Sequence, residues 1–385
     1  MMLTKAAIFL LVVLSAFTVS CVNRKDNHSS DSKSPGTSLI LKAERFSIAR
    51  NDSFTLVTIF DPWQGADDVS HLYYLVERGK NAPIEADPSL IIPVPVRKII
   101  CMSSTHVAMV SALGEQETIA GISGTNYIYD DFLKSRADSG YIREVGYDSE
   151  INEEVILKTD PDLIMMYGIG IESAGYVGKI SDLGIKIMFD ADYLETDPLG
   201  KAEWIKVFGA LYCKEKLANS IFDVTARSYN DIKTFISKNI ATRPSVLLGL
   251  PFRDTWFISP GNSYISTLIS DAGGKYLWED RKSSVSIPNS LESVYIKSLD
   301  AEYWLNPGNA TSKRDIASLE PRLEKIPCFI SGNIYNNTKR TSAGGGNDYW
   351  ESGTLSPHIL LKDIASILHP GIFGDHELYY FKKIE

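Results

Sequence analysis

The sequence predicts an α/β fold in which two α/β lobes with mainly parallel central sheets are joined by a long helical segment. In two separate regions, short apolar segments alternate with helical segments, which is typical of parallel sheets covered by helices. A helical pattern without strand-like segments separates these two regions. The length of 385 residues also exceeds what one hydrophobic core usually serves, so two lobes are expected.

The first 20 residues have the pattern of a signal peptide. Lys5 precedes the apolar run AAIFLLVVLSAFTVS, and small residues come before Cys21. This arrangement resembles a bacterial lipoprotein signal, in which Cys21 is lipidated; an ordinary signal peptide with an incidental cysteine is the alternative. Residues 21–40 are polar, as in a flexible tether. We therefore expect an extracytoplasmic protein with a lipid anchor on the periplasmic side of a bacterial membrane.

Charge and cysteine content exclude some classes of function. A net charge of −9 without a basic stripe argues against a nucleic-acid partner, because phosphate backbones attract clustered Lys and Arg. Cys101, Cys213 and Cys328 remain after Cys21, and they form neither a CxxC nor a Cys/His metal spacing. We expect buried free thiols, at most one disulfide bond, no protein-bound metal and no cofactor.

The elements of the first half follow in order. Residues 41–96 predict a small β-rich extension with alternating segments such as FTLVTIF, and the prolines of IIPVPV are expected to break any regular element. The first α/β lobe occupies residues 97–198. There a strand over 98–102 leads into a helix that begins near Ser103 and ends at Gly114, and the next strand covers 118–122. PDLIMMYG is another buried strand, and VGKISDLGIKIMFD combines a helix, a glycine stop and a strand.

Residues 199–240 predict the connecting helix, with a bend or break near 213–216. Its apolar residues fall at helical spacing, among them Trp204, Val207, Phe208 and Leu211. The second α/β lobe covers residues 241–385. Its predicted elements are the strand SVLLGL, the helix SYISTLISDAGG, the strand AEYWLN and a closing helix around LLKDIASILHP.

Five segments within residues 97–370 carry a resemblance: RKIICMSSTHVAMVSALGEQETIAGIS, INEEVILKTDPDLIMMYG, LGIKIMF, GNSYISTLISDAGG and SLESVYIKSLDAEYWLN. In order and spacing they resemble the substrate-binding proteins of ABC importers for ferric siderophores, haem and cobalamin. The resemblance implies a binding protein rather than an enzyme, with an ABC permease as its partner. It also implies that one exposed glutamate on each lobe docks on the permease membrane subunits. Glu154 and Glu292 occupy those positions, with Glu153 as an alternative to Glu154.

The loops that follow strands supply the candidate ligand-binding residues. Ligands of open α/β sheets lie beyond the carboxyl ends of the strands, and two facing lobes make a ligand cleft between such ends. The candidates are Ser104, Thr105, His106, Tyr127, Tyr129, Tyr167, Arg253, Trp256, Tyr264, Asn347, Asp348, Tyr349 and Trp350. His106 is either a metal ligand or a helix-start residue, and Tyr127 and Tyr129 are either Fe(III) ligands or packing residues. Trp256 and Tyr264 either stack on the ligand or pack in the lobe core.

The segment GGGNDYWESG, residues 344–353, is interpreted as a loop that lines the cleft. Glycines allow close backbone approach, Asn347 and Asp348 offer hydrogen bonds, and Tyr349 and Trp350 offer flat faces for a large chelate. A structural turn and a site for acid/base catalysis are the alternatives. A phosphate cradle is not expected, because no glycine run leads to a Lys-Ser or Lys-Thr pair.

We expect the ligand to be a ferric siderophore or a similar large metal chelate, with cobalamin or haem as the alternative. Arg253, Lys339 and Arg340 would suit an anion, whereas Trp256 and Trp350 would suit either ligand. An extracytoplasmic hydrolase and a surface adhesion lipoprotein are the alternatives from other classes. The sequence has no GxSxG, HExxH or GxGxxG in a fitting context, and adhesion gives no reason for two α/β lobes.

Overall fold

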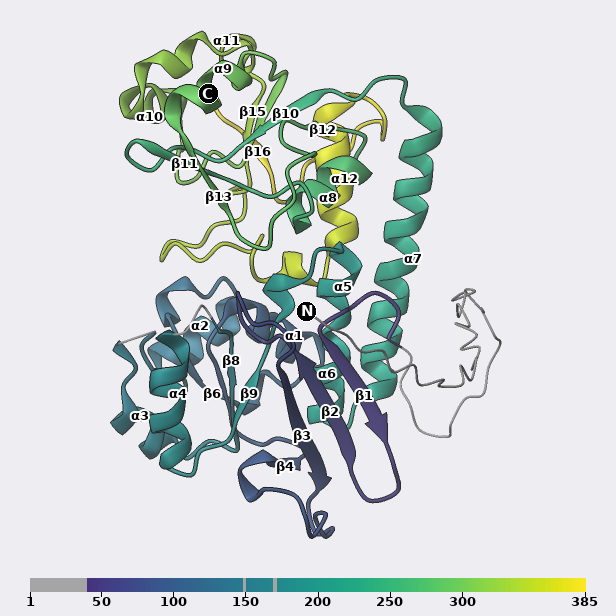
Figure 1. Ribbon diagram of the computed structural model, residues 1–385, viewed down its shortest axis with the longest axis vertical. Coiled ribbons are helices and arrows are strands. Elements are labelled where there is room, and N and C mark those ends of the chain that lie inside the picture. Colours follow the sequence, from purple (N-terminus) through teal and green to yellow (C-terminus); the bar gives the residue numbers. More distant parts are fainter. Residues whose placement is uncertain (1–39, 148–149, 169–171) are drawn as a thin grey trace, which may run out of the picture. The chain divides into compact units, whose positions relative to one another are not determined.

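The computed structural model describes residues 40–147, 150–168 and 172–385 (Figure 1). The predicted signal peptide, the lipidation site at Cys21 and residues 22–39 of the predicted tether lie outside these residues. The predicted fold class is confirmed, because two lobes with largely parallel sheets are joined by a helical segment that contains the long helix Glu215–Asn239.

The extension forms a four-stranded sheet in the order β1-β2-β3-β4, antiparallel except for the parallel pair β3 and β4. Its strands are β1 (Phe46–Arg50), β2 (Thr55–Phe60), β3 (Ser70–Glu77) and β4 (Ile91–Val94). The prolines of IIPVPV do not exclude a strand, contrary to the prediction. Because β4 lies at the sheet edge, the missing N–H of Pro93 is tolerated there.

The first lobe has a five-stranded parallel sheet in the order β7-β6-β5-β8-β9. Its strands are β5 (Ile99–Cys101), β6 (Ile119–Ile122), β7 (Arg143–Glu144), β8 (Leu163–Met166) and β9 (Ile187–Phe189). Its helices are α1 (Ser104–Ala112), α2 (Asp131–Asp138), α3 (Glu153–Thr159) and α4 (Glu172–Asp182). All four residues of β8 are buried, as expected for a strand covered on both faces.

The connection consists of three helices, and one of the breaks between them lies near the predicted position at 213–216. They are α5 (Pro198–Glu203), α6 (Ile205–Leu211) and α7 (Glu215–Asn239), and Figure 1 shows α7 running alongside both lobes. The chain turns between α6 and α7, where Cys213 has a φ of 54°. All three described cysteines are free, as predicted, but the prediction of burial is wrong for Cys213, because this turn exposes it.

The second lobe has a five-stranded sheet in the order β12-β10-β14-β15-β16, parallel except for β16. Its strands are β10 (Ser245–Leu248), β12 (Lys275–Tyr276), β14 (Tyr303–Leu305), β15 (Ile334–Asn336) and β16 (Lys382–Lys383). A separate antiparallel pair joins β11 (Thr255–Ile258) and β13 (Ile287–Ser290). The helices are α8 (Tyr264–Asp271), α9 (Leu291–Ser298), α10 (Lys313–Leu319), α11 (Pro327–Ser331) and α12 (Pro357–Leu368).

Candidate ligand-binding cleft

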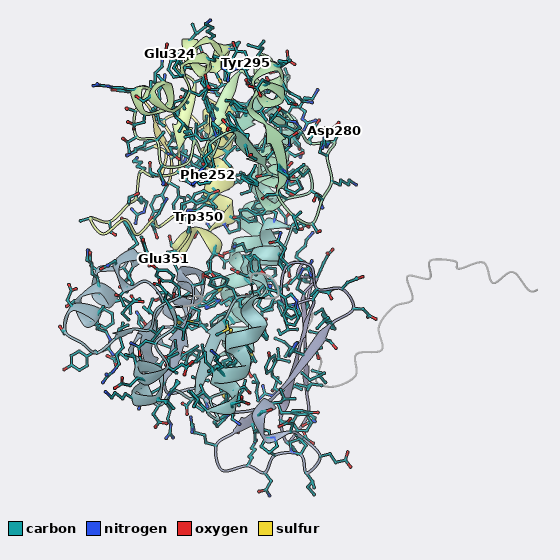
Figure 2. The ribbon with its side chains drawn as sticks, turned by 60° about the vertical axis from the view of Figure 1, so that its left-hand side comes forward. Phe252, Asp280, Tyr295, Glu324, Trp350 and Glu351 are labelled. Carbon is teal, nitrogen blue, oxygen red and sulfur yellow. The ribbon has the colours of Figure 1, made fainter. Side chains whose placement is uncertain are left out.

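A cleft of about 830 Å³ lies between the lobes, within the usual size range of small-molecule sites. Figure 2 shows Trp350 and Glu351 at the level where the two lobes meet. Three parts of the chain line the cleft: the first lobe with α5, the second lobe and the extension. The lining residues used below are Arg45, Gln64, Ser104, Thr105, Tyr167, Asp192, Tyr193, Glu195, Lys201, Tyr264, Tyr349 and Trp350.

The first lobe presents the start of α1 to the cleft. Ser103 caps this helix, since its hydroxyl accepts a hydrogen bond from the Thr105 N–H at 3.2 Å. The cap directs the first turn, with Ser104 and Thr105, toward the cleft. Hydroxyl groups beside the positive end of a helix dipole suit oxygen acceptors on a ligand.

Two tyrosines follow the ends of β8 and β9. The rings of Tyr167 and Tyr193 meet edge to face, with centroids 6.3 Å apart. The Tyr193 hydroxyl donates to the Gly168 carbonyl and accepts from the Gln64 N–H at 3.2 Å. Burial raises the pKa of Tyr193 to about 12, so its phenol stays neutral near pH 7.

Charged side chains lie at the boundary of the extension and α5. The ammonium of Lys201 is 3.5 Å from Asp192 Oδ2 and lies over the Tyr264 ring, 5.7 Å from its centroid. Glu195 accepts from the backbone N–H groups of Glu44 and Arg45. Burial raises the pKa of Glu195 to about 6, although these hydrogen bonds act to lower it.

The second lobe contributes an aromatic wall. Tyr349 and Trp350 meet edge to face, with ring centroids 4.7 Å apart. Tyr349 is buried and also packs against Tyr380 and Phe381, whereas Trp350 is 53% exposed. The Tyr349 ring is therefore fixed by its neighbours, and the Trp350 ring is available to a ligand.

The glycine segment also contacts the first lobe. A Cβ atom on Gly344 would lie 2.4 Å from the Asn126 carbonyl oxygen, and one on Gly346 would lie 2.4 Å from that of Tyr127. Only glycine allows the two backbones to approach so closely. Beyond the glycines, the Glu351 carboxylate accepts from the N–H groups of Tyr129 at 2.9 Å and Asp130 at 3.3 Å.

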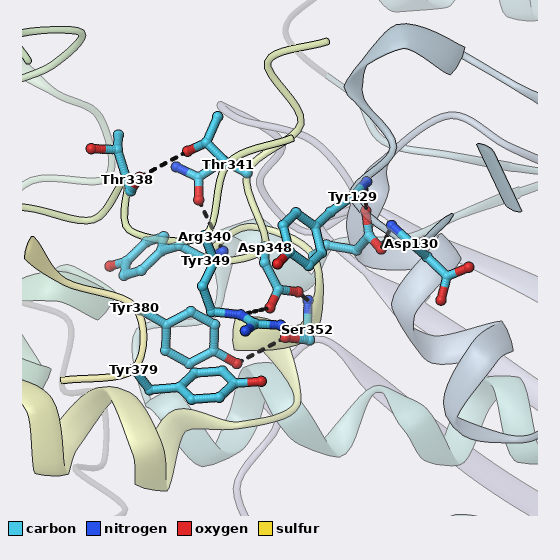
Figure 3. Close-up of polar contacts among 12 residues, drawn as sticks. Tyr129, Asp130, Thr338, Arg340, Thr341, Asp348, Tyr349, Ser352, Tyr379 and Tyr380 are labelled. Atoms are coloured by element: carbon cyan, nitrogen blue, oxygen red, sulfur yellow. Dashed lines mark hydrogen bonds and ion pairs between the residues drawn. The ribbon is translucent and has the colours of Figure 1, made fainter. Parts of the chain in front are cut away.

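The same segment is braced within its own lobe. The Arg340 guanidinium donates to Asp348 Oδ2 at 2.6 Å and lies over the Tyr379 ring at 4.2 Å (Figure 3). The Asn347 side chain accepts from the Tyr349 N–H at 3.1 Å. Asn347 and Asp348 thus shape the loop rather than line the cleft. The segment therefore lines the cleft at Tyr349 and Trp350 and also contacts the first lobe, a contact that the sequence did not predict.

The structure brings some predicted site residues together in the cleft and places others elsewhere. Those that line the cleft are Ser104, Thr105, Tyr167, Tyr264, Tyr349 and Trp350. His106, in the first turn of α1, has a fully buried side chain with its Nε2 3.5 Å from Asp190 Oδ2, and burial lowers the pKa of His106 to about 4. Trp256 is also fully buried; its indole N–H donates to the Leu248 carbonyl at 3.0 Å, so of its two alternatives the core position holds.

The remaining predicted residues also lie outside the cleft lining. Tyr127 is 60% exposed beside the glycine segment, and Tyr129 lies under Arg340, 5.0 Å from ring centroid to guanidinium. Arg253 lies in the turn before β11, with its guanidinium over Phe252. The three cations that were expected to suit an anion, Arg253, Lys339 and Arg340, are absent from the cleft lining. Lys339 instead pairs with Glu377, and Arg340 pairs with Asp348.

Sequence reasoning missed the cleft residues Arg45, Gln64, Tyr193 and Lys201. Tyr193 could have been found, because it follows a predicted strand, as Tyr167 does. Nothing in the sequence indicated that the extension reaches the cleft. Among the residues that the structure describes, no cluster of three or more His, Cys, Asp or Glu side chains could hold a metal ion.

Comparison with protein families identifies a match over most of the two lobes. The sequence model described as Periplasmic binding protein matches residues 99–341. An uncharacterized lipoprotein of Methanocaldococcus jannaschii is 28% identical over 303 residues, which are 76% of this chain and 70% of that protein. None of the helices within the described residues is long and apolar enough to span a bilayer.

Solved structures share the fold at low sequence identity. A periplasmic heme binding protein from Pseudomonas aeruginosa aligns with a TM-score of 0.58 and 14% identity, over 75% of this chain and 98% of that one. An ABC-type Fe3+-hydroxamate transport system protein from Saccharomonospora viridis aligns with a TM-score of 0.52 and 17% identity, over 71% and 94% of the two chains.

Proposed function

Because the chain belongs to the periplasmic binding protein family, and is thus a solute-binding component of an ABC importer rather than an enzyme, we propose that its solute is a ferric siderophore or a similar large metal chelate. Delivery of the chelate to a membrane permease completes the proposed role. Proteins of the same fold that are named for haem and for Fe3+-hydroxamate support this ligand class.

The lining of the cleft carries the proposal. Trp350 offers a half-exposed indole, and Ser104, Thr105 and Tyr167 offer polar groups around it. Flat side chains stack on flat or apolar ligand surfaces, while hydroxyls bind peripheral oxygens. The cleft's cations, Arg45 and Lys201, lie beside the carboxylates of Asp61 and Asp192, so the lining favours a chelate of low net charge, such as a ferric hydroxamate. Cobalamin, whose periphery carries neutral amides, is the second candidate.

Isothermal titration of the purified protein with ferrichrome, hemin and cyanocobalamin tests this proposal. We expect ferrichrome to bind, and we expect Trp350→Ala to weaken binding by about 1–3 kcal/mol, as for an interface hot spot. Phe252→Ala is the matched control, because Phe252 is an exposed aromatic of the same lobe that does not line the cleft. Absence of binding for all three chelates, or equal binding by wild type and Trp350→Ala, would contradict the proposal.

Two exposed glutamates are proposed to dock on the permease. Glu154, in the first turn of α3, has a side chain that is 76% exposed and accepts a hydrogen bond from Lys158 at 2.6 Å. Glu292, in the first turn of α9, is 66% exposed and lies 3.5 Å from Arg322. Both carboxylates are open to cationic partners. Glu153, beside Glu154 in the same turn, is also exposed and remains the alternative.

The N-terminal region is proposed to anchor the protein on the outer side of a membrane. The signal before Cys21 and the lipoprotein relative support a lipid at this cysteine. That relative is archaeal, so the proposal is not limited to a bacterial host.

A further inference from the structure

The extension precedes the residues that the family model matches, yet it reaches the cleft. We propose that the extension is a specificity element of the cleft, and that Arg45 and Gln64 bind acceptor oxygens at the rim of the chelate. This inference rests on the proposed function of the cleft.

The chain around Arg45 is held in place by two buried carboxylates, one shortly before α5 and one at the end of α5. Glu203 is fully buried and accepts from the N–H groups at residues 41–43, at 2.7 to 3.1 Å. Glu195 accepts from the N–H groups of Glu44 and Arg45 at 3.1 to 3.2 Å. Because charge-assisted hydrogen bonds are strong, the backbone of Arg45 is fixed at the margin of the cleft.

The β2–β3 loop, residues 61–69, lies along the carboxyl ends of β8 and β9, where ligands of such sheets bind. Trp63 pairs with Gly168 in a parallel bridge, and its ring packs on Phe189 with centroids 5.5 Å apart. A Cβ on Gly168 would lie 2.7 Å from Trp63 Cβ, so glycine is needed for this close contact. The next residue, Gln64, is anchored through its backbone N–H to the Tyr193 hydroxyl and is one of the residues that line the cleft.

This end of the cleft carries hydrogen-bond donors beside the carboxylates of Asp192 and Glu195. Arg45 is 30% exposed and donates from Nη1 to the Asp61 carbonyl at 3.1 Å. A guanidinium carries five N–H donors, so further donors remain for a ligand. Gln64 adds an amide, and Lys201 adds an ammonium 3.5 Å from Asp192 Oδ2. Carbonyl, hydroxamate or carboxylate oxygens at a chelate rim match this set.

The test uses Arg45→Ala, Gln64→Ala and the double variant, titrated with ferrichrome, hemin and cyanocobalamin by calorimetry. For whichever probe binds the wild type, we expect each single change to weaken binding about five- to ten-fold or more, as for loss of a hydrogen bond. Gln64→Ala keeps the backbone anchor and removes only the amide. Arg50→Ala is the matched control, because Arg50 is an arginine of the same sheet that pairs with Glu215 and lies outside the cleft lining.

The outcomes separate this inference from the proposed function. If the wild type binds a probe and Trp350→Ala weakens it, but Arg45→Ala and Gln64→Ala bind like the wild type, the inference is overturned and the proposed function stands. If Arg50→Ala loses as much affinity as Arg45→Ala, the extension acts through fold stability and the inference is overturned. If the wild type binds none of the three probes, the proposed function is contradicted, and the inference that rests on it is overturned as well.

Discussion

The Glu351 carboxylate is buried at the contact between the lobes, which makes its protonation a measurable property of the fold. Burial raises the pKa of Glu351 to about 7; the two N–H groups that it accepts oppose this shift, and the nearby Asp348 and Asp130 reinforce it. Asp348 accepts a hydrogen bond from the Arg340 guanidinium at 2.6 Å. The carboxylate of Glu351 is thus held among backbone N–H groups and other acids.

The expected effect on stability follows from the difference between a pKa of about 7 in the folded protein and the ordinary 4.5. At about 1.36 kcal/mol for each pH unit, this difference corresponds to roughly 3 kcal/mol of unfolding free energy. The folded state binds the proton more tightly than the unfolded state does. Stabilisation by the protonated form is therefore complete below about pH 4.5 and is lost as the pH rises through about 7.

Glu351→Gln isolates this contribution, because glutamine has a similar shape and does not titrate. The assay is urea unfolding of wild type and variant between pH 4.5 and 8.5. The difference between the two unfolding free energies is taken at each pH, because contributions from the other titrating groups are common to both proteins and cancel. As the pH rises over this range, we expect the unfolding free energy of the variant to increase by about 3 kcal/mol relative to that of the wild type. Asn347→Ala is the control, because it changes the same loop without changing a titratable group.

A difference that stays constant with pH would refute this reasoning. So would a variant that loses stability relative to the wild type as the pH rises. The first result would mean that the N–H groups of Tyr129 and Asp130, at the start of α2, balance the penalty of burying the charge, and the second that they exceed it.

Three further predictions concern docking, anchoring and the core. Replacement of Glu154 and Glu292 together by Ala is expected to abolish uptake by cells while chelate affinity and Tm stay unchanged; normal uptake would remove both residues from the docking proposal. Cys21→Ser is expected to release the protein from the membrane fraction, and retention there would contradict the lipid anchor. Trp256→Ala is expected to cost about 3–5 kcal/mol of unfolding free energy, because a fully buried indole and its hydrogen bond are lost. Urea unfolding measures this cost, and a loss of chelate affinity by the folded variant would instead argue for ligand contact.

The sequence predicted most of the fold because its local signals agree with the tertiary structure. The strand Leu163–Met166 was recognisable as a continuous apolar run, since both of its faces are covered. Ser103 marked the start of α1, because its side chain does cap the helix. The strand Ile91–Val94 was missed because tolerance of Pro93 depends on its position at a sheet edge, which local sequence does not encode.

The site was predicted less completely, because its residues depend on which face of a strand points to the core and on contacts between distant parts of the chain. In β11 the side chains alternate, so Trp256 is buried and Phe257 is exposed, and the sequence did not indicate which of the two faces the core. The cleft position of Arg45 depends on its contact with Glu195, which lies 150 residues further along the chain. No periodic pattern encodes such a contact.

The composition of the segment GGGNDYWESG fitted no single motif because the segment has two roles in the structure. Trp350 and Glu351 are neighbours in the chain, yet Trp350 lines the cleft while Glu351 reaches the N–H groups of the other lobe. The glycines before them are required by the approach to the backbone at 126–128. One short stretch of backbone therefore carries both the aromatic wall of the cleft and a hydrogen-bonded link between the lobes. A ligand that shifts the backbone at Trp350 therefore also acts on the neighbouring residue, whose carboxylate accepts from the Tyr129 N–H.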